Sequence, residues 1–468
     1  MVFSSTVFLF AFLPSVLLLY YLCPRQLRSG ILLLASLVFY SWGEPVYILV
    51  MLFSTVFDYI NGLLIERALV QGRRGRARAV LICSVCGNLL ILGFFKYGDF
   101  LVKNLNALLG TAITPLDLPL PIGISFYTFQ TMSYTIDLYR GQGRAQRSLV
   151  DFGAFVALFP QLVAGPIVRY QNIEARLRFR RESPECFLQG AERFIRGLFK
   201  KLVFANSLGL MWERISAAEP ISLSAGTAWL GALAFSLQIY YDFSGYSDMA
   251  IGLGRMLGFR FLENFNDPFL ADSITDFWRR WHISMGTWFR DYVYIPLGGN
   301  KGGLAKQLSN IAIVWLLTGF WHGASWNFVL WGVYFGILLV LEKLFLLRWL
   351  KRLPAVLRHI YALVLVTISW TLFAFTEISK GAAWCKAMLS GVLFDSSSLY
   401  LLLTYGPMLA ICALTATPLG KRFYEKIGTR LGQRALTVVD CGGLFCVLVM
   451  STAYLVSGSY NPFLYFRF

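Results

Sequence analysis

Long stretches without a charged residue alternate with short basic segments along this chain. No Asp, Glu, Lys or Arg occurs in residues 3–24, 79–95, 152–168, 221–241, 307–341, 360–376, 396–420 and 442–466. An α-helix needs about 20 apolar residues to cross a bilayer, and shorter apolar runs more often form buried or re-entrant pieces. The pattern predicts an all-α polytopic membrane protein with about ten to twelve transmembrane and re-entrant helices, several of them short.

The composition supports this class of protein. Hydrophobic residues make up 57% of the chain and charged residues only 14%, which excludes an ordinary soluble domain. The formal net charge of +17 would suggest nucleic-acid binding in a soluble protein. Here the basic residues fall in short segments between apolar runs, so we predict a lipid bilayer as the partner and no nucleic acid.

The basic segments also predict the topology, because loops rich in Lys and Arg remain in the cytoplasm. The first apolar run begins MVFSS, with no basic segment before it and no cleavage site after it, so we expect a retained span that starts outside. Residues 152–168 and 307–341 each join two basic loops; the first must be re-entrant or broken, and the second must cross and return. The last run leaves from a basic loop, which puts both chain ends on the outer face of the inner membrane.

No internal repeat or long linker divides the sequence, so we predict a single integral-membrane domain over residues 1–468. Within it we expect a cytoplasmic-side catalytic segment at about 255–306 and an outer-face tail at 457–468. Cys83 and Cys86 form a lone C-x-x-C without a second pair or a nearby histidine. We therefore predict no metal site.

Residues 264–303 read NFNDPFLADSITDFWRRWHISMGTWFRDYVYIPLGGNKGG and mix aromatic with charged residues. The S-x-x-D pattern predicts a helix capped by Ser273. If this helix is continuous, its 3.6-residue period places Trp278, His282, Met285 and Phe289 on one poorly hydrated face.

The same continuous helix would carry a basic face. Arg279 and Arg290 are eleven residues apart and would share it, with Asp276 one turn before Arg279 and Arg280. Such a face suits an anionic group that enters from the cytoplasm. The basic bias of cytoplasmic loops is the other explanation for these arginines.

A second histidine, His322, lies in TGFWHGASW near the middle of the charge-free run 307–341. An ionisable group at membrane depth is costly and marks a candidate functional site. Desolvation favours neutral imidazole, which suits a general base. Gly319 and Gly323 flank it and remove side chains where a substrate would approach. The alternative is a structural hydrogen bond to a neighbouring helix.

At these two histidine stretches the sequence resembles the membrane-bound O-acyltransferase superfamily, in particular the bacterial branch of alginate O-acetylation and teichoic-acid D-alanyl transfer proteins. The resemblance covers most of the chain and is weakest between about residues 346 and 436. Its most specific stretches are LPIGISFYTFQTMSYTIDLYRG, LFPQLVAGPIVRY, YYDFSGYSDMAIGLGRMLGF, SITDFWRRWHISMGTWFRDYVYIPLGGN and FWHGASWNFVLWG.

The resemblance implies a ring of tilted helices around a central tunnel, through which a cytoplasmic acyl donor and an outer-face acceptor reach one histidine. His322 would be that catalytic residue, and His282 the second histidine on the cytoplasmic side. The implied donor is acetyl-CoA, with no bound cofactor, and the implied partner is a periplasmic acetyltransferase that modifies an exopolysaccharide such as alginate. The expected donor-binding and tunnel-lining residues are Trp278, Arg279, Arg280, Trp281, Met285, Trp288, Arg290, Trp321 and Asn327.

The chain ends in NPFLYFRF, after turn residues Gly458, Asn461 and Pro462. One reading is an interfacial belt of aromatic rings that anchors the last span. The related systems suggest another, in which Tyr465 is a transient acyl carrier. A phenol with a pKa near 10 needs a base at neutral pH, and His322 would be that base.

Two other functions remain open at the level of sequence. The same fold with a different donor would transfer D-alanine from a carrier protein to a cell-wall polymer. A secondary transporter would also have broken spans and a buried histidine, although such proteins commonly show paired halves. Cellulose or another exopolysaccharide is the alternative to alginate as the final polymer.

Overall fold

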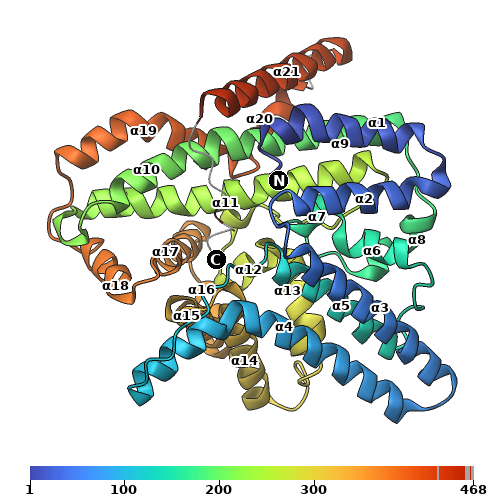
Figure 1. Ribbon diagram of the computed structural model, residues 1–468. Helices are drawn as coiled ribbons and strands as arrows, with labels where there is room; N and C mark the ends of the chain where they lie inside the picture. Colours follow the sequence, from blue (N-terminus) through green and yellow to red (C-terminus); the bar gives the residue numbers. More distant parts are fainter. Residues whose placement is uncertain (429–431, 459–463, 465–468) are drawn as a thin grey trace. The chain divides into compact units, whose positions relative to one another are not determined.

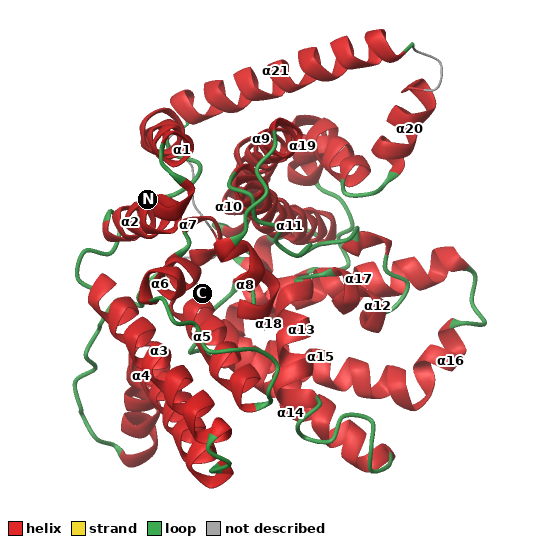
Figure 2. Cartoon of the chain, turned by 90° about the vertical axis from the view of Figure 1, so that its right-hand side faces the viewer, coloured by secondary structure: helices red, strands yellow, loops and turns green. Residues whose placement is uncertain are grey.

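The computed structural model describes residues 1–428, 432–458 and Leu464 (Figure 1). All regular secondary structure within these residues is helical, as Figure 2 shows. Contacts divide the chain into two compact units, Met1–Phe194 with Ser247–Leu262 and Ile195–Tyr246 with Glu263–Phe468. Each unit is described by itself.

The first unit is built from short and long helices around a polar centre. Its helices are α1 (Leu13–Leu22), α2 (Arg28–Ser41), α3 (Ile48–Val70), α4 (Arg74–Leu109), α5 (Ile124–Tyr139), α6 (Leu149–Ala157), α7 (Phe159–Leu162), α8 (Tyr170–Arg178) and the start of α9 (Pro184–Phe199). Buried Asp58 of α3 accepts hydrogen bonds from Ser84 Oγ at 2.7 Å and from Asn88 Nδ2 at 2.6 Å, both on α4. These bonds satisfy a carboxyl group that would otherwise be costly to bury.

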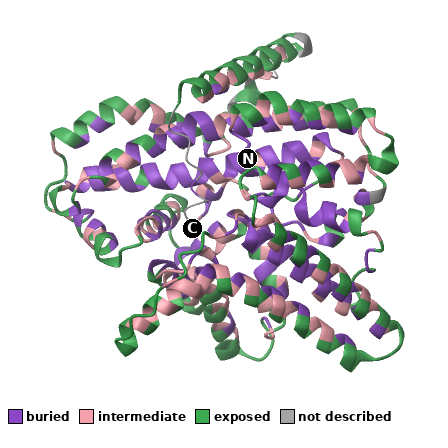
Figure 3. Cartoon of the chain, in the orientation of Figure 1, coloured by how far each residue is buried: buried purple, intermediate pink, exposed green. Residues whose placement is uncertain are grey.

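Both predicted catalytic histidines, His282 and His322, lie in the second unit, whose main helices follow. They are π-helix η3 (Lys200–Ala205), α10 (Asn206–Ser216), most of α11 (Ala225–Met256), α12 (Ile274–Arg280), α13 (Ile283–Phe289), π-helix η6 (Arg290–Tyr294), α14 (Leu304–His322), α15 (Trp326–Leu341), π-helix η7 (Glu342–Leu346), α16 (Leu347–Leu350), α17 (Ala355–Ala374), α18 (Ile378–Ala387), α19 (Ser396–Thr415), α20 (Leu419–Gly428) and α21 (Gln433–Ser457). Much of α11 is buried, whereas most of α21 is exposed (Figure 3).

Six helices of the described residues are long and apolar enough to cross a membrane. They are Ile48–Val70, Arg74–Leu109, Trp326–Leu350, Ala355–Ala374, Ser396–Thr415 and Ala435–Ser457, and Phe8–Leu22 is a shorter apolar helix. Their outward side chains include many exposed Leu, Val and Phe residues, as expected where lipid replaces water. The prediction of an all-α polytopic membrane protein is thereby confirmed.

The first of the two unusual apolar runs has the predicted form, and the second folds back on itself. Residues 152–168 are broken, because α6 ends before Leu158, whose ψ of 109° is not helical, and α7 begins directly after it. Residues 307–341 form a helical hairpin of α14 and α15. The two helices are antiparallel, since Gly319 meets Gly332 and Trp315 meets Gly336.

Candidate active site

Within the predicted catalytic segment, α12 and α13 are two short helices with a sharp corner between them. Ser273 caps α12, as predicted, and its hydroxyl accepts a hydrogen bond from Asp276 N. The helix stops at Trp281, and His282 has a positive φ of 47°, a strained value for a residue with a side chain. The prediction of one continuous helix with Trp278, His282, Met285 and Phe289 on a shared face is therefore wrong.

Asn264 holds this corner from 18 residues away. Its backbone oxygen accepts a hydrogen bond from Ile283 N at 3.0 Å. Its side-chain Oδ1 accepts from Ser284 N at 3.2 Å and from Ser284 Oγ at 2.9 Å, and it lies 3.1 Å from His282 Nδ1. With Oδ1 as the acceptor, His282 Nδ1 carries the proton and Nε2 keeps its lone pair.

The imidazole of His282 is buried among rings. Its exposed fraction is 1%, and its ring centroid lies 4.6 Å from that of Phe243. Nε2 has no hydrogen-bond partner in the part of the chain that the structure describes. Burial lowers the pKa of His282 to about 3, so the side chain is neutral across the physiological pH range.

This shift makes the stability of the protein pH-dependent. In the unfolded chain histidine has a pKa near 6.5, so between about pH 3 and 6.5 the unfolded state binds one proton more than the folded state. The stability from this residue is complete above pH 6.5 and is lost as the pH falls, by about 2 kcal/mol between pH 7.5 and 5. His282→Asn keeps a donor toward Asn264 and should lose this dependence. In detergent, its unfolding midpoint should therefore change less with pH than that of the wild type. An unchanged slope would contradict the burial of a neutral imidazole.

The start of α12 is fixed by a buried carboxyl group on a different helix. Glu342, at the end of α15 and 1% exposed, accepts hydrogen bonds from Ile274 N at 2.7 Å, Thr275 N at 2.8 Å and Thr275 Oγ1 at 2.6 Å. The hydroxyl of Tyr361 donates to it as well, at 3.1 Å. A carboxyl group at the positive end of a helix satisfies its free amides and orients it.

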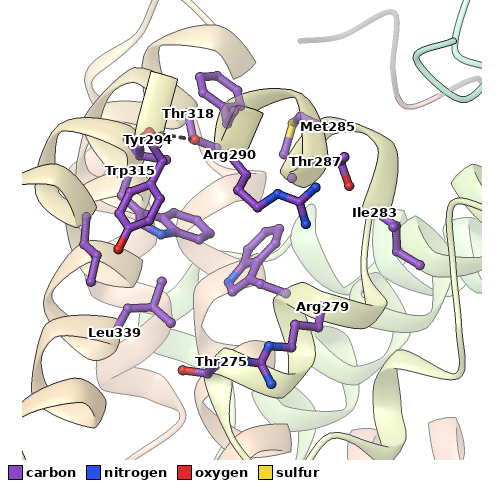
Figure 4. Close-up of a pocket in the computed structure, with 15 residues that line it drawn as sticks. Thr275, Arg279, Ile283, Met285, Thr287, Arg290, Tyr294, Trp315, Thr318 and Leu339 are labelled. Atoms are coloured by element: carbon purple, nitrogen blue, oxygen red, sulfur yellow. Dashed lines mark hydrogen bonds between the residues drawn. The ribbon is translucent and has the colours of Figure 1, made fainter. Parts of the chain in front are cut away.

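This orientation builds one wall of a pocket of about 520 Å³. Figure 4 shows it, with Arg279 extending towards Thr275 and the Arg290 side chain also inside. The lining residues come from both halves of the corner, from η6 and from α14 and α15: Thr275, Trp278, Arg279, Ile283, Met285, Gly286, Thr287, Phe289, Arg290, Tyr294, Ile311, Val314, Trp315, Thr318 and Leu339. A mostly apolar hollow with two guanidinium groups suits an anionic ligand with an apolar part.

The three predicted arginines have different partners. Arg280 Nε bonds to Asp276 Oδ2 at 2.8 Å, the predicted one-turn pair, and does not line the pocket. Arg290 lines the pocket but bonds to the neighbouring Asp291 at 2.7 Å. Arg279 lines the pocket and forms no ion pair with any described residue. Its guanidinium group is therefore the one most available to an anion.

His322 ends α14, directly before the turn of the hairpin, and is partly buried. Its ring centroid lies 4.9 Å from that of Trp331 on α15 and 5.3 Å from that of Phe373 on α17. The indole of Trp321 lies 5.0 Å from the ring of His322 and 6.0 Å from that of His282. Forty residues apart in sequence, the two histidines thus contact the same tryptophan.

Tryptophans also connect the pocket with His322. Trp278 lines the pocket, and its ring lies 5.6 Å from that of Trp331, which in turn contacts the imidazole of His322. His322 itself is not among the pocket-lining residues. Two indole side chains, Trp278 and Trp331, therefore connect the arginine-lined pocket with the candidate catalytic histidine.

The glycines beside His322 have a different role from the predicted one. A Cβ on Gly319 would lie 2.5 Å from the carbonyl oxygen of Phe328, and one on Gly323 would lie 2.3 Å from the Phe328 ring. They allow α14 and α15 to pack closely, as small residues do in membrane proteins. The prediction that they leave space for a substrate is wrong.

The remaining predicted residues do not line the pocket. Trp281 stacks on Phe277 and packs on Trp370, while Trp288 contacts Phe289 and Tyr292. Asn327 Nδ2 donates to the carbonyl oxygen of Phe373 at 3.3 Å. Residues missed by the sequence analysis are Asn264, Trp315, Trp331, Glu342 and Phe373, whose contacts across the fold have no short motif.

The candidate acyl carrier Tyr465 lies outside the described residues. The residue before it, Leu464, is described and buried, with 5% exposed. It belongs to the same hydrophobic cluster as Trp281, Trp331 and Phe373. The N–H of Leu464 donates to Asp242 Oδ2 at 2.9 Å.

Comparisons with known proteins identify the family of this chain. The sequence profile of the membrane-bound O-acyltransferase family matches residues 116–380. A probable alginate O-acetylase of Azotobacter vinelandii is 40% identical over the full length of both chains. A peptidoglycan O-acetyltransferase of Helicobacter pylori is 32% identical over 84% of this chain and 81% of its own, and a teichoic acid D-alanyltransferase of Bacillus subtilis is 27% identical over 54% of this chain and 67% of its own. The chain belongs to the membrane-bound O-acyltransferase family and is a multi-pass membrane O-acyltransferase.

Proposed function

We propose that this protein takes an acetyl group from cytoplasmic acetyl-CoA and passes it outward to a periplasmic acetyltransferase that O-acetylates an exopolysaccharide. Alginate is the proposed polymer, because the full-length relative from Azotobacter vinelandii carries that name. The observation that carries the proposal is the pocket with Arg279, which ring contacts through Trp278 and Trp331 connect to His322. An anionic donor would bind at one end of this arrangement and react at the other.

The proposed donor suits the chemistry of the pocket. Acetyl-CoA is polyanionic at its nucleotide end and neutral at its thioester, and its charged part is too costly to move into the bilayer. A guanidinium without an ion-pair partner favours a phosphate group. The apolar residues around it, such as Trp278 and Trp315, suit the less polar arm that leads to the thioester.

The proposed chemistry is acyl transfer through a tyrosine ester. His322 takes the proton of the Tyr465 phenol, and the phenolate oxygen attacks the carbonyl carbon of the thioester. The C–S bond breaks, and the imidazolium gives its proton to the leaving thiolate, so that coenzyme A is released as the free thiol. The acetyl ester of Tyr465 is then the substrate of the periplasmic partner, and the imidazole is regenerated.

This sequence of steps needs a particular orientation in the bacterial inner membrane. The arginine-lined pocket has to face the cytoplasm, where basic loops remain, and both chain ends have to lie on the periplasmic side. The tail is then available to a periplasmic partner, while the coenzyme A stays in the cytoplasm.

Purified protein mixed with acetyl-CoA tests the reaction against its alternatives. We expect one free coenzyme A thiol and one acetyl group on the chain for each active molecule. A transporter would leave the thioester intact. A D-alanyltransferase, the name of the relative from Bacillus subtilis, would require a charged carrier protein and would not react with acetyl-CoA.

Arg279→Ala is expected to raise the KM for acetyl-CoA about 10- to 100-fold with a much smaller change in kcat. A hydrogen bond to a charged group contributes about 1.5–3 kcal/mol, and each 1.4 kcal/mol is a factor of ten in affinity. Arg280→Ala is the matched control, because its ion pair with Asp276 is partly exposed and contributes at most about 1 kcal/mol. Equal KM values for the two variants would remove the donor-binding role of Arg279.

A further inference from the structure

The last described residue of the chain is attached to the core by its backbone. The N–H of Leu464 donates to Asp242 Oδ2 at 2.9 Å, and the side chain of Leu464 is buried in the hydrophobic cluster of the second unit. These two contacts are made by a residue directly before Tyr465. A terminal segment without such contacts would be expected to be loose.

Asp242 accepts this bond as half of a buried ion pair. Lys201 Nζ lies 2.7 Å from Asp242 Oδ1, and the two side chains are only 3% and 4% exposed. Lys201 also donates to Asn206 Oδ1 at 3.2 Å. A buried ion pair contributes little net stability, because desolvation cancels most of the attraction. We therefore expect the pair of Lys201 and Asp242 to do more than hold α11 against η3.

The two carboxylate oxygens of Asp242 have different partners, which suggests a role in holding the chain end. Oδ1 is neutralised by Lys201, and Oδ2 receives the N–H of the tail. Close packing makes this geometry possible, since a Cβ on Gly245 would lie 2.8 Å from the carbonyl oxygen of Gly197 and 3.2 Å from Lys201 N. The backbone of Lys201 therefore packs closely on α11, within reach of Asp242 for its ammonium group.

The attachment point lies next to a residue that contacts His282. Phe243 follows Asp242 on α11, and its ring centroid is 4.6 Å from that of His282. Trp281, the neighbour of His282, lies 6.1 Å from Tyr240 on the same turn of α11. One turn of α11 thus contacts both the tail and the corner that carries His282.

We propose that Asp242, with its charge balanced by Lys201, is a latch that holds the C-terminal tail by Leu464, on the turn of α11 that contacts His282. Asp242 and Lys201 are then positioning residues that act through Leu464, and the transfer step that they assist rests on the proposed function. The latch predicts a tail that stays seated even without donor or partner protein.

Leu464→Pro tests the latch at the tail itself. Proline has no N–H to donate, so this variant removes the bond and leaves the ion pair of Asp242 and Lys201 intact. Leu464→Val is the matched control, because it keeps the N–H and an apolar side chain. The full-length protein in detergent, without donor, is digested with a carboxypeptidase, and the release of the last residues is followed by mass spectrometry.

We expect Leu464→Pro to release its C-terminal residues at least about tenfold faster than wild type, with Leu464→Val within about threefold. The release rate of Asp242→Asn should lie between those of the two Leu464 variants, because its amide oxygen still accepts the hydrogen bond but carries no charge. Equal release from the proline and valine variants overturns the latch. Unfolding midpoints of all variants identify any loss of fold.

A second readout separates positioning from general destabilisation and tests the link to transfer. In Leu464→Pro the rate of acetyl transfer should fall with an unchanged KM for acetyl-CoA, whereas a damaged fold would also change the KM. If the tail of the wild type is protected but never carries acetyl, the latch stands and the carrier role of Tyr465 fails. If acetyl is carried equally by the proline variant, the latch has no part in transfer.

Discussion

His322→Ala is expected to lower the rate of acetyl transfer about 10²- to 10⁴-fold, the usual contribution of a positioned general base. The imidazole lies between Trp331 and Phe373 at the end of α14, and its removal leaves the proposed phenol nucleophile protonated. The KM for acetyl-CoA should change little, because His322 does not line the arginine pocket. The rate of this single thiol release by purified protein, measured over a range of acetyl-CoA concentrations, gives the rate constant and the concentration at half-maximal rate.

His359→Ala is the matched control for this substitution. His359 lies on α17 in the same unit, with its Nδ1 3.0 Å from the carbonyl oxygen of Ala271, away from the aromatic cluster around His322. Its loss should change the rate by less than about threefold, as for most substitutions outside a site. A fully active His322→Ala protein would remove His322 from the mechanism and favour its structural role.

Tyr465→Phe is expected to abolish outward transfer of acetyl groups, by at least about 10³-fold, as does the loss of other covalent nucleophiles. The substitution deletes only the oxygen that would form the ester, and it keeps the aromatic ring. If the last residues act solely as an interfacial belt, phenylalanine should replace tyrosine without loss. The variant therefore separates the two readings of the chain end.

Tyr460→Phe is the control, because it removes a second hydroxyl from the same part of the sequence. Mass spectrometry of the C-terminal peptide after exposure to acetyl-CoA should show an added acetyl group in wild type and in Tyr460→Phe. It should show none in Tyr465→Phe. Normal export by Tyr465→Phe would restore the belt as the sufficient explanation.

Features encoded over short distances in the sequence were predicted well. The cap at Ser273 and the pair of Asp276 with Arg280 depend on residues three or four positions apart, and the structure has both. The broken run 152–168 and the hairpin of 307–341 followed from the distribution of charge. Hydropathy also identified the class of fold, because a bilayer restricts spanning segments to a few structures.

Features made by distant residues were predicted poorly. Periodicity indicated one helix through His282, but Asn264 forms four hydrogen bonds with residues 282–284, and the helix is broken there. Arg279 and Arg290 do meet in one pocket, although by way of this corner and not by helical spacing. Glu342 accepts a hydrogen bond from Ile274 N at the start of α12, 68 residues earlier in the chain. No local sequence pattern predicts such a contact.

The central claim is that an acetyl group crosses the membrane while coenzyme A does not. Its most direct test is the protein in lipid vesicles, with acetyl-CoA added outside that carries different isotopes in its acetyl and coenzyme A parts. We predict acetyl label on the C-terminal peptide, one released thiol for each acetyl bound, and no coenzyme A label inside the vesicles. Equal amounts of both labels inside, with the thioester intact, would contradict the account.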